Sequence, residues 1–181
     1  MTDILLLCTA NTCRSPMAEA LLRRRLAARD VVASVHSAGM LGDGERPPPE
    51  AISAMTAYGV DTGSHRSRQV SVTDLVHADL VIAMTRMHLR HAVVMLPEVW
   101  SRAFTLKELV RRGEAIGARP ASEPLAGWLA RLHEARDRRS LLGDGPDDDV
   151  ADPVGGPPRA YADSAALLDQ LVTRLVTLWG S

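Results

Sequence analysis

Two cysteines, an arginine and a serine stand within eight residues near the start of the sequence, in the stretch CTANTCRSP, residues 8–16. These are the only two cysteines in the 181 residues. A cysteine thiolate is a nucleophile that can attack phosphorus, and an arginine guanidinium is a planar fork that suits phosphate oxygens. The spacing Cys8, five residues, Arg14, Ser15 therefore predicts a thiolate beneath a bound tetrahedral dianion.

The surroundings of this motif favour the same chemistry. Ile4–Cys8 is a short apolar run, typical of a strand buried on both faces, and a helical pattern follows from Pro16. A loop of small residues between a strand end and a helix N-terminus turns unpaired N–H groups toward one point and makes a nest for an anion. The helix dipole and Arg14 favour the Cys8 thiolate, and Ser15 can donate a hydrogen bond to the sulfur.

Phosphoryl transfer also needs a proton donor for the leaving group. The candidates after the fourth expected strand are Asp144, Asp147–Asp149 and Asp152. Asp147–Asp149 is most simply a solvated run of charge. Asp152 precedes Pro153 and two glycines, a rigid and then tight turn that could hold a carboxylate over the pocket. Without the cysteine motif, the same residues would indicate only an ordinary Asp-Pro turn.

Buried apolar runs alternate with helical patterns along the chain. This order predicts an α/β fold, a small doubly wound, Rossmann-like, four-stranded parallel sheet with helices on both faces, whose ligands bind beyond the carboxyl ends of the strands. Cys8 stands at such an end. The expected strands are Ile4–Cys8, Val31–Ser37, Leu80–Met84 and Arg102–Leu106, and the expected helices are Pro16 onward, Glu50–Tyr58, a short one capped by Ser71, Arg86–Met95, Leu106–Arg112 and Tyr161–Trp179.

Length and composition indicate one domain, residues 1–181, with a helical excursion over about 112–149 that is too short for a core of its own. A formal net charge of −1 and 3% aromatic residues argue against nucleic-acid or membrane partners. Two cysteines are no disulfide framework, and the first apolar run is too short for a signal peptide, so we expect a cytoplasmic protein.

On these motifs the sequence resembles the low-molecular-weight protein tyrosine phosphatases over nearly the whole chain. The similar segments are CTANTCRSPMAEALL for the phosphate loop, VHSAGM, YGVDTGSHRSRQV, ADLVIAMT, and the late DP of the general-acid loop. The resemblance implies that Cys8 is the nucleophile and forms a cysteinyl-phosphate. Arg14 would bind phosphate and stabilise the transition state, and Asp152 would protonate the leaving group and then activate water.

The resemblance also implies the supporting residues. Cys13 would be the second cysteine that traps Cys8 as a reversible disulfide under oxidant. An inorganic phosphate or similar oxyanion would occupy the active site, and no metal or cofactor is implied. The phosphate-binding loop would comprise Thr9, Ala10, Asn11, Thr12, Cys13, Arg14 and Ser15, and the residues that support it would be Asn11, Ser15, Ser37 and His65.

Three features depart from the family pattern. Ala10 stands where glycine is common, so that peptide should not need a conformation reserved for glycine. Val154 follows Asp-Pro where tyrosine-specific members often have an aromatic residue that packs on a phenol ring. The excursion over about 112–149 is longer than usual, which can reshape the entrance.

The expected activity is hydrolysis of phosphotyrosine in a protein substrate, with phosphoarginine as the alternative on the same scaffold. Tyrosine-directed members commonly have isoleucine at position 12, whereas this chain has Thr12. The bacterial protein-arginine phosphatases of the family resemble it in CTxNTCRSPMAE and in FTLKE, here Phe104–Glu108. A hydroxyl can contact a guanidinium or an attacking water, although Thr and Ile, both β-branched, can also interchange without consequence.

Other readings remain open at this point. Arsenate reductases share the scaffold, but their thiol-relay forms need cysteines beyond Cys8 and Cys13. A phosphate-binding protein without catalysis predicts a missing nucleophile or acid, and this sequence has both. A Cys-x₄-Cys metal site lacks a second ligand pair. His88 and His91 on an expected helix favour surface or packing roles.

Overall fold

The computed structural model describes residues 1–143 and 145–180, so Asp144, one of the acid candidates, lies outside the described residues. The strands are β1 Thr2–Cys8, β2 Ala33–Gly39, β3 Leu80–Ala83 and β4 Ala103–Thr105. The helices are α1 Arg14–Ala27, α2 Pro49–Thr56, α3 Val72–His77, α4 Arg86–Met95, η1 Pro97–Arg102, α5 Leu106–Ile116, α6 Leu125–His133, η2 Arg138–Leu141 and α7 Pro158–Leu178, where η marks a 3₁₀ helix.

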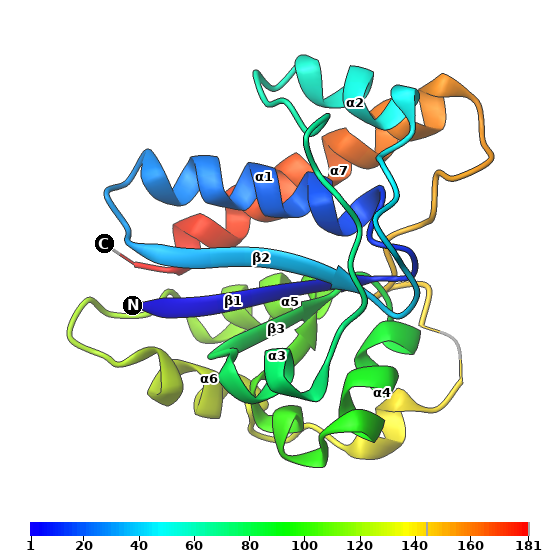
Figure 1. Ribbon diagram of the computed structural model, residues 1–181. Helices are drawn as coiled ribbons and strands as arrows, with labels where there is room; N and C mark the ends of the chain where they lie inside the picture. The colour runs from blue at the N-terminus through cyan, green and yellow to red at the C-terminus, as the bar shows by residue number, and fades with distance from the viewer. Residues whose placement is uncertain (144, 181) are drawn as a thin grey trace.

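The four strands form one parallel sheet in the order β2-β1-β3-β4, which confirms the predicted α/β fold (Figure 1). The chain runs from β1 outward to β2 and then crosses to the other side of β1 to form β3. Neighbouring loops therefore leave the sheet in opposite directions at the carboxyl end of β1, which opens a crevice there. Cys8 is the last residue of β1 and stands at this point.

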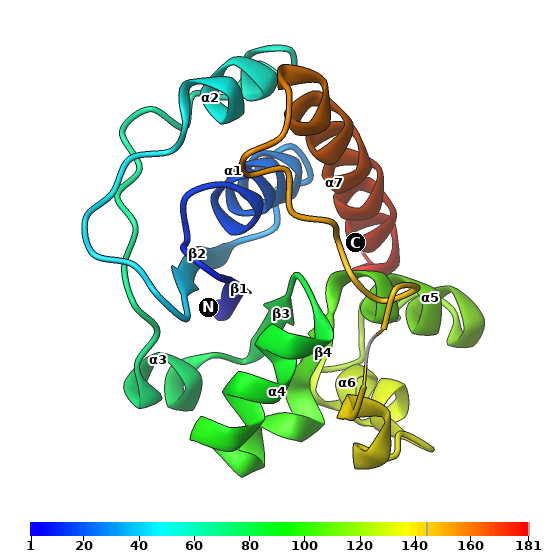
Figure 2. The same ribbon diagram turned by 90° about the vertical axis from the view of Figure 1, so that its right-hand side faces the viewer.

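The sheet divides the core into two layers because successive side chains of a strand point to opposite faces. Ile4, Leu6 and Cys8 face one layer, with α1, α5 and α7, whereas Leu5 and Leu7 face the other, with α3 and α4. Figures 1 and 2 show α1 and α7 together on one side of the sheet and α3 and α4 on the other. β1, β3 and β4 are thus buried on both faces over most of their length, as continuous apolar runs predict, whereas the edge strand β2 is half-buried in its first half.

Several predicted boundaries are wrong by two to four residues, among them the start of the last helix, which is Pro158 instead of Tyr161. The second strand begins at Ala33 instead of Val31, because a turn with Asp30 at a φ of 56° follows α1 and leaves Val32 75% exposed. The helix expected to end at Arg112 continues to Ile116. Gly113 does not end it: a Cβ at Gly113 would lie 2.7 Å from Leu178 Cδ1, so the glycine lets α5 pack closely on α7.

The excursion over about 112–149 packs onto the domain through buried side chains. Trp128 on α6 is fully buried, and Arg136 stacks on the ring of Trp100, with its guanidinium carbon 3.7 Å from the ring centroid. Arg136 also donates two hydrogen bonds to Glu108, at 2.8 and 3.0 Å. A buried ion pair and an aromatic contact therefore tie the end of α6 to α5 and η1.

The interpretation of Asp147–Asp149 as a solvated run is wrong for two of its three residues. Asp148 is 4% exposed and accepts hydrogen bonds from Arg86 and Arg111 at 2.8 and 2.6 Å. Burial alone would raise the pKa of Asp148, but the two guanidinium groups hold it below its usual value. Asp149 accepts a bond from the backbone N–H of Arg86 at 2.7 Å, while Asp147 is exposed. The run ties the segment before Asp152 to α4.

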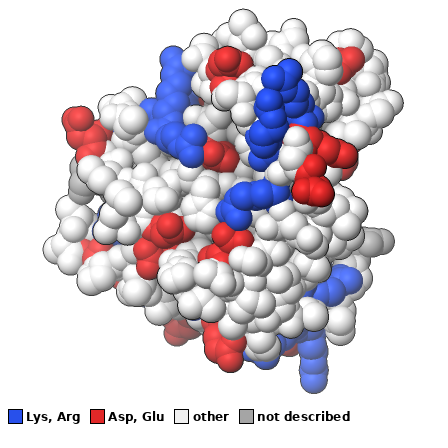
Figure 3. Space-filling model, in the orientation of Figure 1, with Lys and Arg blue, Asp and Glu red and all other residues white. Residues whose placement is uncertain are grey.

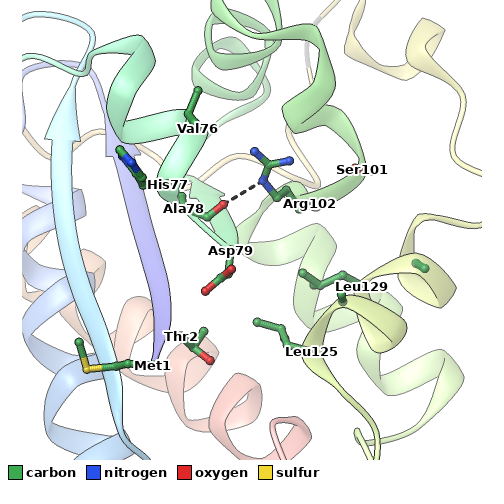
Figure 4. Close-up of a pocket in the computed structure, with 12 residues that line it drawn as sticks. Met1, Thr2, Val76, His77, Ala78, Asp79, Ser101, Arg102, Leu125 and Leu129 are labelled. Carbon is green, nitrogen blue, oxygen red and sulfur yellow. Dashed lines mark hydrogen bonds between the residues drawn. The ribbon is translucent and has the colours of Figure 1, made fainter.

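The far edge of the molecule carries a separate cavity of about 780 Å³ at the amino ends of the strands (Figure 4). Thr2, Asp79, Arg102 and Leu125 are among its lining residues, and Arg102 Nε donates to Ala78 O at 2.8 Å. This cavity lies at the opposite end of β1 from Cys8. On the face shown in Figure 3, acidic and basic residues lie interspersed among uncharged ones. Across residues 1–143 and 145–180, no helix combines the length and apolarity that a membrane span requires.

Candidate active site

Cys8 ends β1 and is 3% exposed, with the loop of residues 9–13 curled above it and α1 beginning at Arg14. Gly39 at the end of β2 lets this loop approach closely, because a Cβ there would lie 2.7 Å from Thr9 O and 2.9 Å from Asn11 N. The N-cap residue Cys13 makes no side-chain capping bond, and α1 has no acidic residue in its first turn. The helix N-terminus is therefore suited to an anion.

The Cys8 sulfur accepts two hydrogen bonds. Ser15 Oγ donates at 3.0 Å and the backbone N–H of Asn11 donates at 3.2 Å. Two donors aimed at one sulfur hold it at the base of the loop as a hydrogen-bond acceptor, with its lone pairs on the side from which a nucleophile acts. The contact between Ser15 and Cys8 has the geometry that the sequence predicts.

Asn11 lies at the centre of the loop network and is fully buried, with a φ of 54°. Its amide nitrogen donates to Ser15 Oγ at 3.0 Å and to Ser37 Oγ at 2.8 Å, and its Oδ1 accepts from the backbone N–H of Arg68 at 3.0 Å. His65 Nε2 lies 2.7 Å from the Asn11 carbonyl oxygen. The four predicted supporting residues are thus connected to one another through Asn11.

Sequence reasoning did not include Glu19 in this network. Ser37 Oγ donates to Glu19 Oε2 at 2.5 Å, so the carboxylate fixes the direction of the hydrogen bonds. Ser37 donates a hydrogen bond to Glu19 and accepts one from Asn11. Ser15 likewise accepts a hydrogen bond from Asn11 and donates one to Cys8. From the sequence, Glu19 lies near the N-terminus of α1, just after its first turn, and this position predicts only a favourable interaction with the helix dipole.

Arg14 is 4% exposed and its guanidinium faces the late loop. It donates to Val150 O at 3.1 Å and to Asp152 Oδ2 at 2.6 Å. The segment that carries these groups passes over the N-terminus of α1 on its way to α7 (Figure 2). The Asp152 side chain is 43% exposed, so one side of this ion pair is open to solvent and to an incoming ligand.

The remaining loop residues take distinct positions. Ala10 has no positive φ, in agreement with the expectation that no glycine is needed there, and Thr12 is 8% exposed. Cys13 is buried and donates to Met17 Sδ at 3.6 Å. Burial, followed by the nearby Asp152 and Cys8, raises the pKa of Cys13 to about 12. Both cysteines are free thiols in this structure, and the predicted redox pairing stays a prediction.

One buried histidine lies beside the loop, where the sequence favours only a surface or packing role. His88 on α4 is fully buried, and its Nε2 lies 2.9 Å from Thr9 Oγ1. Thr9 Oγ1 in turn accepts from Arg14 at 3.3 Å. The helical spacing of His88 and His91 carries no signal of this contact, since it joins residues from two different elements.

The arrangement can bind a tetrahedral dianion above a sulfur nucleophile. The sulfur, the loop, the helix N-terminus and Arg14 face one point, and Asp152 stands beside Arg14 at the opening. Among the described residues, no group of three or more histidine, cysteine and acidic side chains is arranged to hold a metal ion.

Comparison with known proteins agrees with this geometry. The family model described as "Low molecular weight phosphotyrosine protein phosphatase" matches residues 3–138. The chain belongs to this family. Its members are hydrolases of phosphate esters, and the resemblance seen in the sequence motifs is therefore confirmed.

Two family members resemble the chain over nearly its whole length. The protein-arginine-phosphatase of Geobacillus stearothermophilus is 31% identical over 173 residues, which cover 95% of this chain and 92% of that protein. The crystal structure of the low molecular weight protein tyrosine phosphatase from T. tengcongensis is 30% identical, with a TM-score of 0.74 over 97% of this chain and 98% of that one.

A third phosphatase structure bears on the chemistry. It is a mutant of the YwlE arginine phosphatase with a phosphorylated active-site serine, 27% identical to this chain, with a TM-score of 0.74 over 97% of this chain and 93% of that one. A phosphorylated side chain in place of the nucleophile is consistent with a covalent phosphoryl intermediate on this scaffold.

Proposed function

We propose that this protein is a cysteine-dependent phosphoprotein phosphatase in which Cys8 is the nucleophile. The observation that carries the proposal is the pair of hydrogen bonds to the Cys8 sulfur at the base of an anion-binding loop. A sulfur that is held as thiolate beneath a bound phosphoryl group is placed for in-line attack.

The proposed reaction has two steps. Cys8 attacks phosphorus, the bond to the leaving group breaks, and the leaving group takes a proton from Asp152. Water then attacks the cysteinyl-phosphate, gives its proton to the Asp152 carboxylate and displaces the thiolate, which releases inorganic phosphate. Arg14 binds the equatorial oxygens throughout, where charge develops in the transition state.

The ion pair between Arg14 and Asp152 fits this sequence of events. The carboxylate bonds to the guanidinium at 2.6 Å. An arriving dianion competes for Arg14, so Asp152 exchanges its cationic partner for an anionic neighbour. In this proposal the carboxyl released from Arg14 lies beside the leaving-group oxygen, to which a general acid donates its proton.

The nucleophile is tested by hydrolysis of a chromogenic aryl phosphate. Cys8→Ser should abolish turnover but keep the binding of inorganic phosphate, because the loop and Arg14 remain. Full activity in this variant would overturn the assignment.

The acid is tested with a series of aryl phosphates of increasing leaving-group pKa. Asp152→Ala should lose rate most with poor leaving groups, which depend on protonation, and least with nitrophenolate. An equal loss across the series would argue against the acid role.

Two phosphorylated side chains are candidate substrates. The description of the family model names phosphotyrosine, which supports the first candidate. Features near the loop favour phosphoarginine. Thr12 provides a hydroxyl in place of an aliphatic side chain, and Val154, which is 55% exposed beside Asp152, provides no aromatic face for a phenol ring. The relative named protein-arginine-phosphatase also covers 95% of the chain.

The choice is tested by comparing kcat/KM on phosphoarginine and phosphotyrosine peptides of matched sequence. We expect wild type to prefer phosphoarginine and Thr12→Ile to shift the ratio toward phosphotyrosine. Thr12→Ser, which keeps the hydroxyl, is the matched control. A ratio that is the same in wild type and Thr12→Ile would remove Thr12 from the argument.

We also propose that the protein acts in the cytoplasm on phosphorylated proteins. The proposed nucleophile Cys8 must be reduced for turnover, and two unpaired cysteines suit a reducing compartment. Cell fractionation with an antibody to the protein checks this directly, and recovery in an oxidising compartment would contradict it.

A further inference from the structure

A chain of side-chain contacts leads from α4 to the phosphate clamp. Thr85, the N-cap of α4, has its Oγ1 2.8 Å from His88 Nδ1, and His88 Nε2 lies 2.9 Å from Thr9 Oγ1. Thr9 Oγ1 lies 3.3 Å from the same Arg14 nitrogen that binds Asp152. Thr9 is half-buried and belongs to the loop over Cys8, so its hydroxyl borders the anion site.

The direction of these hydrogen bonds follows from the number of hydrogens on each group. Thr85 Oγ1 accepts from the backbone N–H of His88, so its single hydrogen is free to bond His88 Nδ1. Nδ1 is then the acceptor, and a neutral imidazole must carry its hydrogen on Nε2 and donate it to Thr9. Thr9 Oγ1 thus accepts from both His88 and Arg14, since a guanidinium only donates.

This assignment leaves the Thr9 hydrogen unused by the protein groups around it. With both acceptor sites of the oxygen filled, the hydroxyl can only donate. In the opposite tautomer Thr9 would donate to Nε2, Nδ1 would donate to Thr85 Oγ1, and the Thr85 hydrogen would be the unused one. Thr85 is buried whereas Thr9 is half-buried at the loop, and an unused donor costs more free energy when it is buried, so the first arrangement is the more stable one.

The surroundings keep the imidazole neutral, as the assignment requires. Burial, and then the positive charges of Arg14 and His91, lower the pKa of His88 to about 3. A charged His88 would have hydrogens on both ring nitrogens, and the bond from the Thr85 hydroxyl would be lost.

We propose that the Thr9 hydroxyl donates a hydrogen bond to a phosphoryl oxygen bound in the loop, and that His88 and Thr85 are positioning residues that orient it. This inference rests on the proposed function only for the identity of the ligand. The loop thereby gains a side-chain donor in addition to its backbone N–H groups and Arg14.

The contact is tested by binding of inorganic phosphate, measured by calorimetry on the full chain, together with kcat/KM on an aryl phosphate. Thr9→Val keeps the shape of the side chain and removes the hydroxyl, and Thr9→Ser keeps the hydroxyl. We expect Thr9→Val to weaken phosphate binding by about tenfold to a hundredfold, as for the loss of a hydrogen bond to a charged group, and Thr9→Ser to restore most of it. Unchanged phosphate affinity in Thr9→Val would overturn the proposal.

The role of His88 is tested in the same assay. His88→Leu should weaken phosphate binding in the wild-type background but add little in the Thr9→Val background, because it acts through Thr9. His88→Gln, whose amide can still donate to Thr9, should retain more affinity than His88→Leu, and His91→Gln on the same helix is the matched control with wild-type affinity. A merely structural His88 would give equal losses in both backgrounds and equal losses for Gln and Leu.

These outcomes are separate from those of the proposed function. If His88→Leu does not fold, the comparison of Thr9→Val with Thr9→Ser and the affinity of His88→Gln still decide the question. If wild type binds phosphate in a Thr9-dependent way but hydrolyses neither a phosphoester nor phosphoarginine, the proposed function fails and the phosphate contact stands.

Discussion

Replacing Asn11 with alanine should both destabilise the protein and stop catalysis. The amide makes three hydrogen bonds, to Ser15, Ser37 and the backbone N–H of Arg68. Each is buried or half-buried, and each contributes about 1 kcal/mol to the free energy of unfolding. An alanine at the φ of 54° found here adds a cost of about 1 kcal/mol. The expected loss is therefore about 4 kcal/mol.

The catalytic effect of Asn11→Ala has a separate cause. Without the amide, Ser15 loses the donor that fixes its oxygen, so its own hydrogen is no longer held on the Cys8 sulfur. Urea unfolding measures the stability. The activity is measured as kcat/KM on an aryl phosphate, without urea and at a temperature at which the variant is fully folded.

Two further Asn11 variants separate these causes. Asn11→Gly should recover about 1 kcal/mol of the stability, since glycine adopts the left-handed conformation freely, but it should not recover activity. Asn11→Asp can accept but not donate, so it should draw the Ser15 hydrogen away from Cys8 and lose activity while the fold persists. Wild-type stability and kcat/KM in Asn11→Ala would refute the reasoning.

Three more predictions concern the buried charges and thiols. The pKa of His88 falls from 6.5 in the unfolded chain to about 3 in the fold, so the unfolded chain binds more protons between these values. Stability should therefore be full above about pH 6.5 and decline toward pH 3, by about 4 kcal/mol at about 1.4 kcal/mol per pKa unit, and urea titrations of His88→Leu should lack this component. Arg136→Met should cost about 3 kcal/mol of unfolding free energy, because it leaves buried Glu108 short of a cation, with Arg136→Lys intermediate since it lacks the planar fork. Iodoacetamide at pH 7.5 should label Cys8 and spare Cys13, whose pKa of about 12 keeps it a thiol, as mass spectrometry of tryptic peptides would reveal; preferential labelling of Cys13 would contradict this.

Local patterns were sufficient for the fold class and for much of the site. The alternation of apolar runs with helical spacing predicts the parallel sheet, because buried strands and amphipathic helices each have a period that the sequence displays directly. The cysteine, arginine and serine of the loop lie within eight residues, so the chain itself brings them together once β1 and α1 form. The contact between Ser15 and Cys8 follows from this short segment alone.

Contacts between distant segments were harder to predict. Asp148 belongs to a run of three acidic residues, a pattern typical of a solvated surface. It is nevertheless buried, because Arg86 on α4 and Arg111 on α5 form ion pairs with its carboxylate. Gly113 is of a residue type that is common at helix ends. Helix α5 nevertheless continues through it, because the missing side chain lets α5 and α7 pack closely at this position. A residue type indicates the environment that it favours on average, whereas contacts with distant segments decide whether a given residue is buried and whether its helix continues.

The amino-acid sequence by itself determined the nucleophile motif, the order of strands and helices, and the family resemblance, since these depend on neighbours along the chain. Only the tertiary structure decided that Asp152 meets Arg14, that Glu19 bonds to Ser37, and that His88 contacts Thr9. The physical reason is that a hydrogen bond acts over about 3 Å, and residues 18 to 138 positions apart reach that distance only when the sheet brings their elements together.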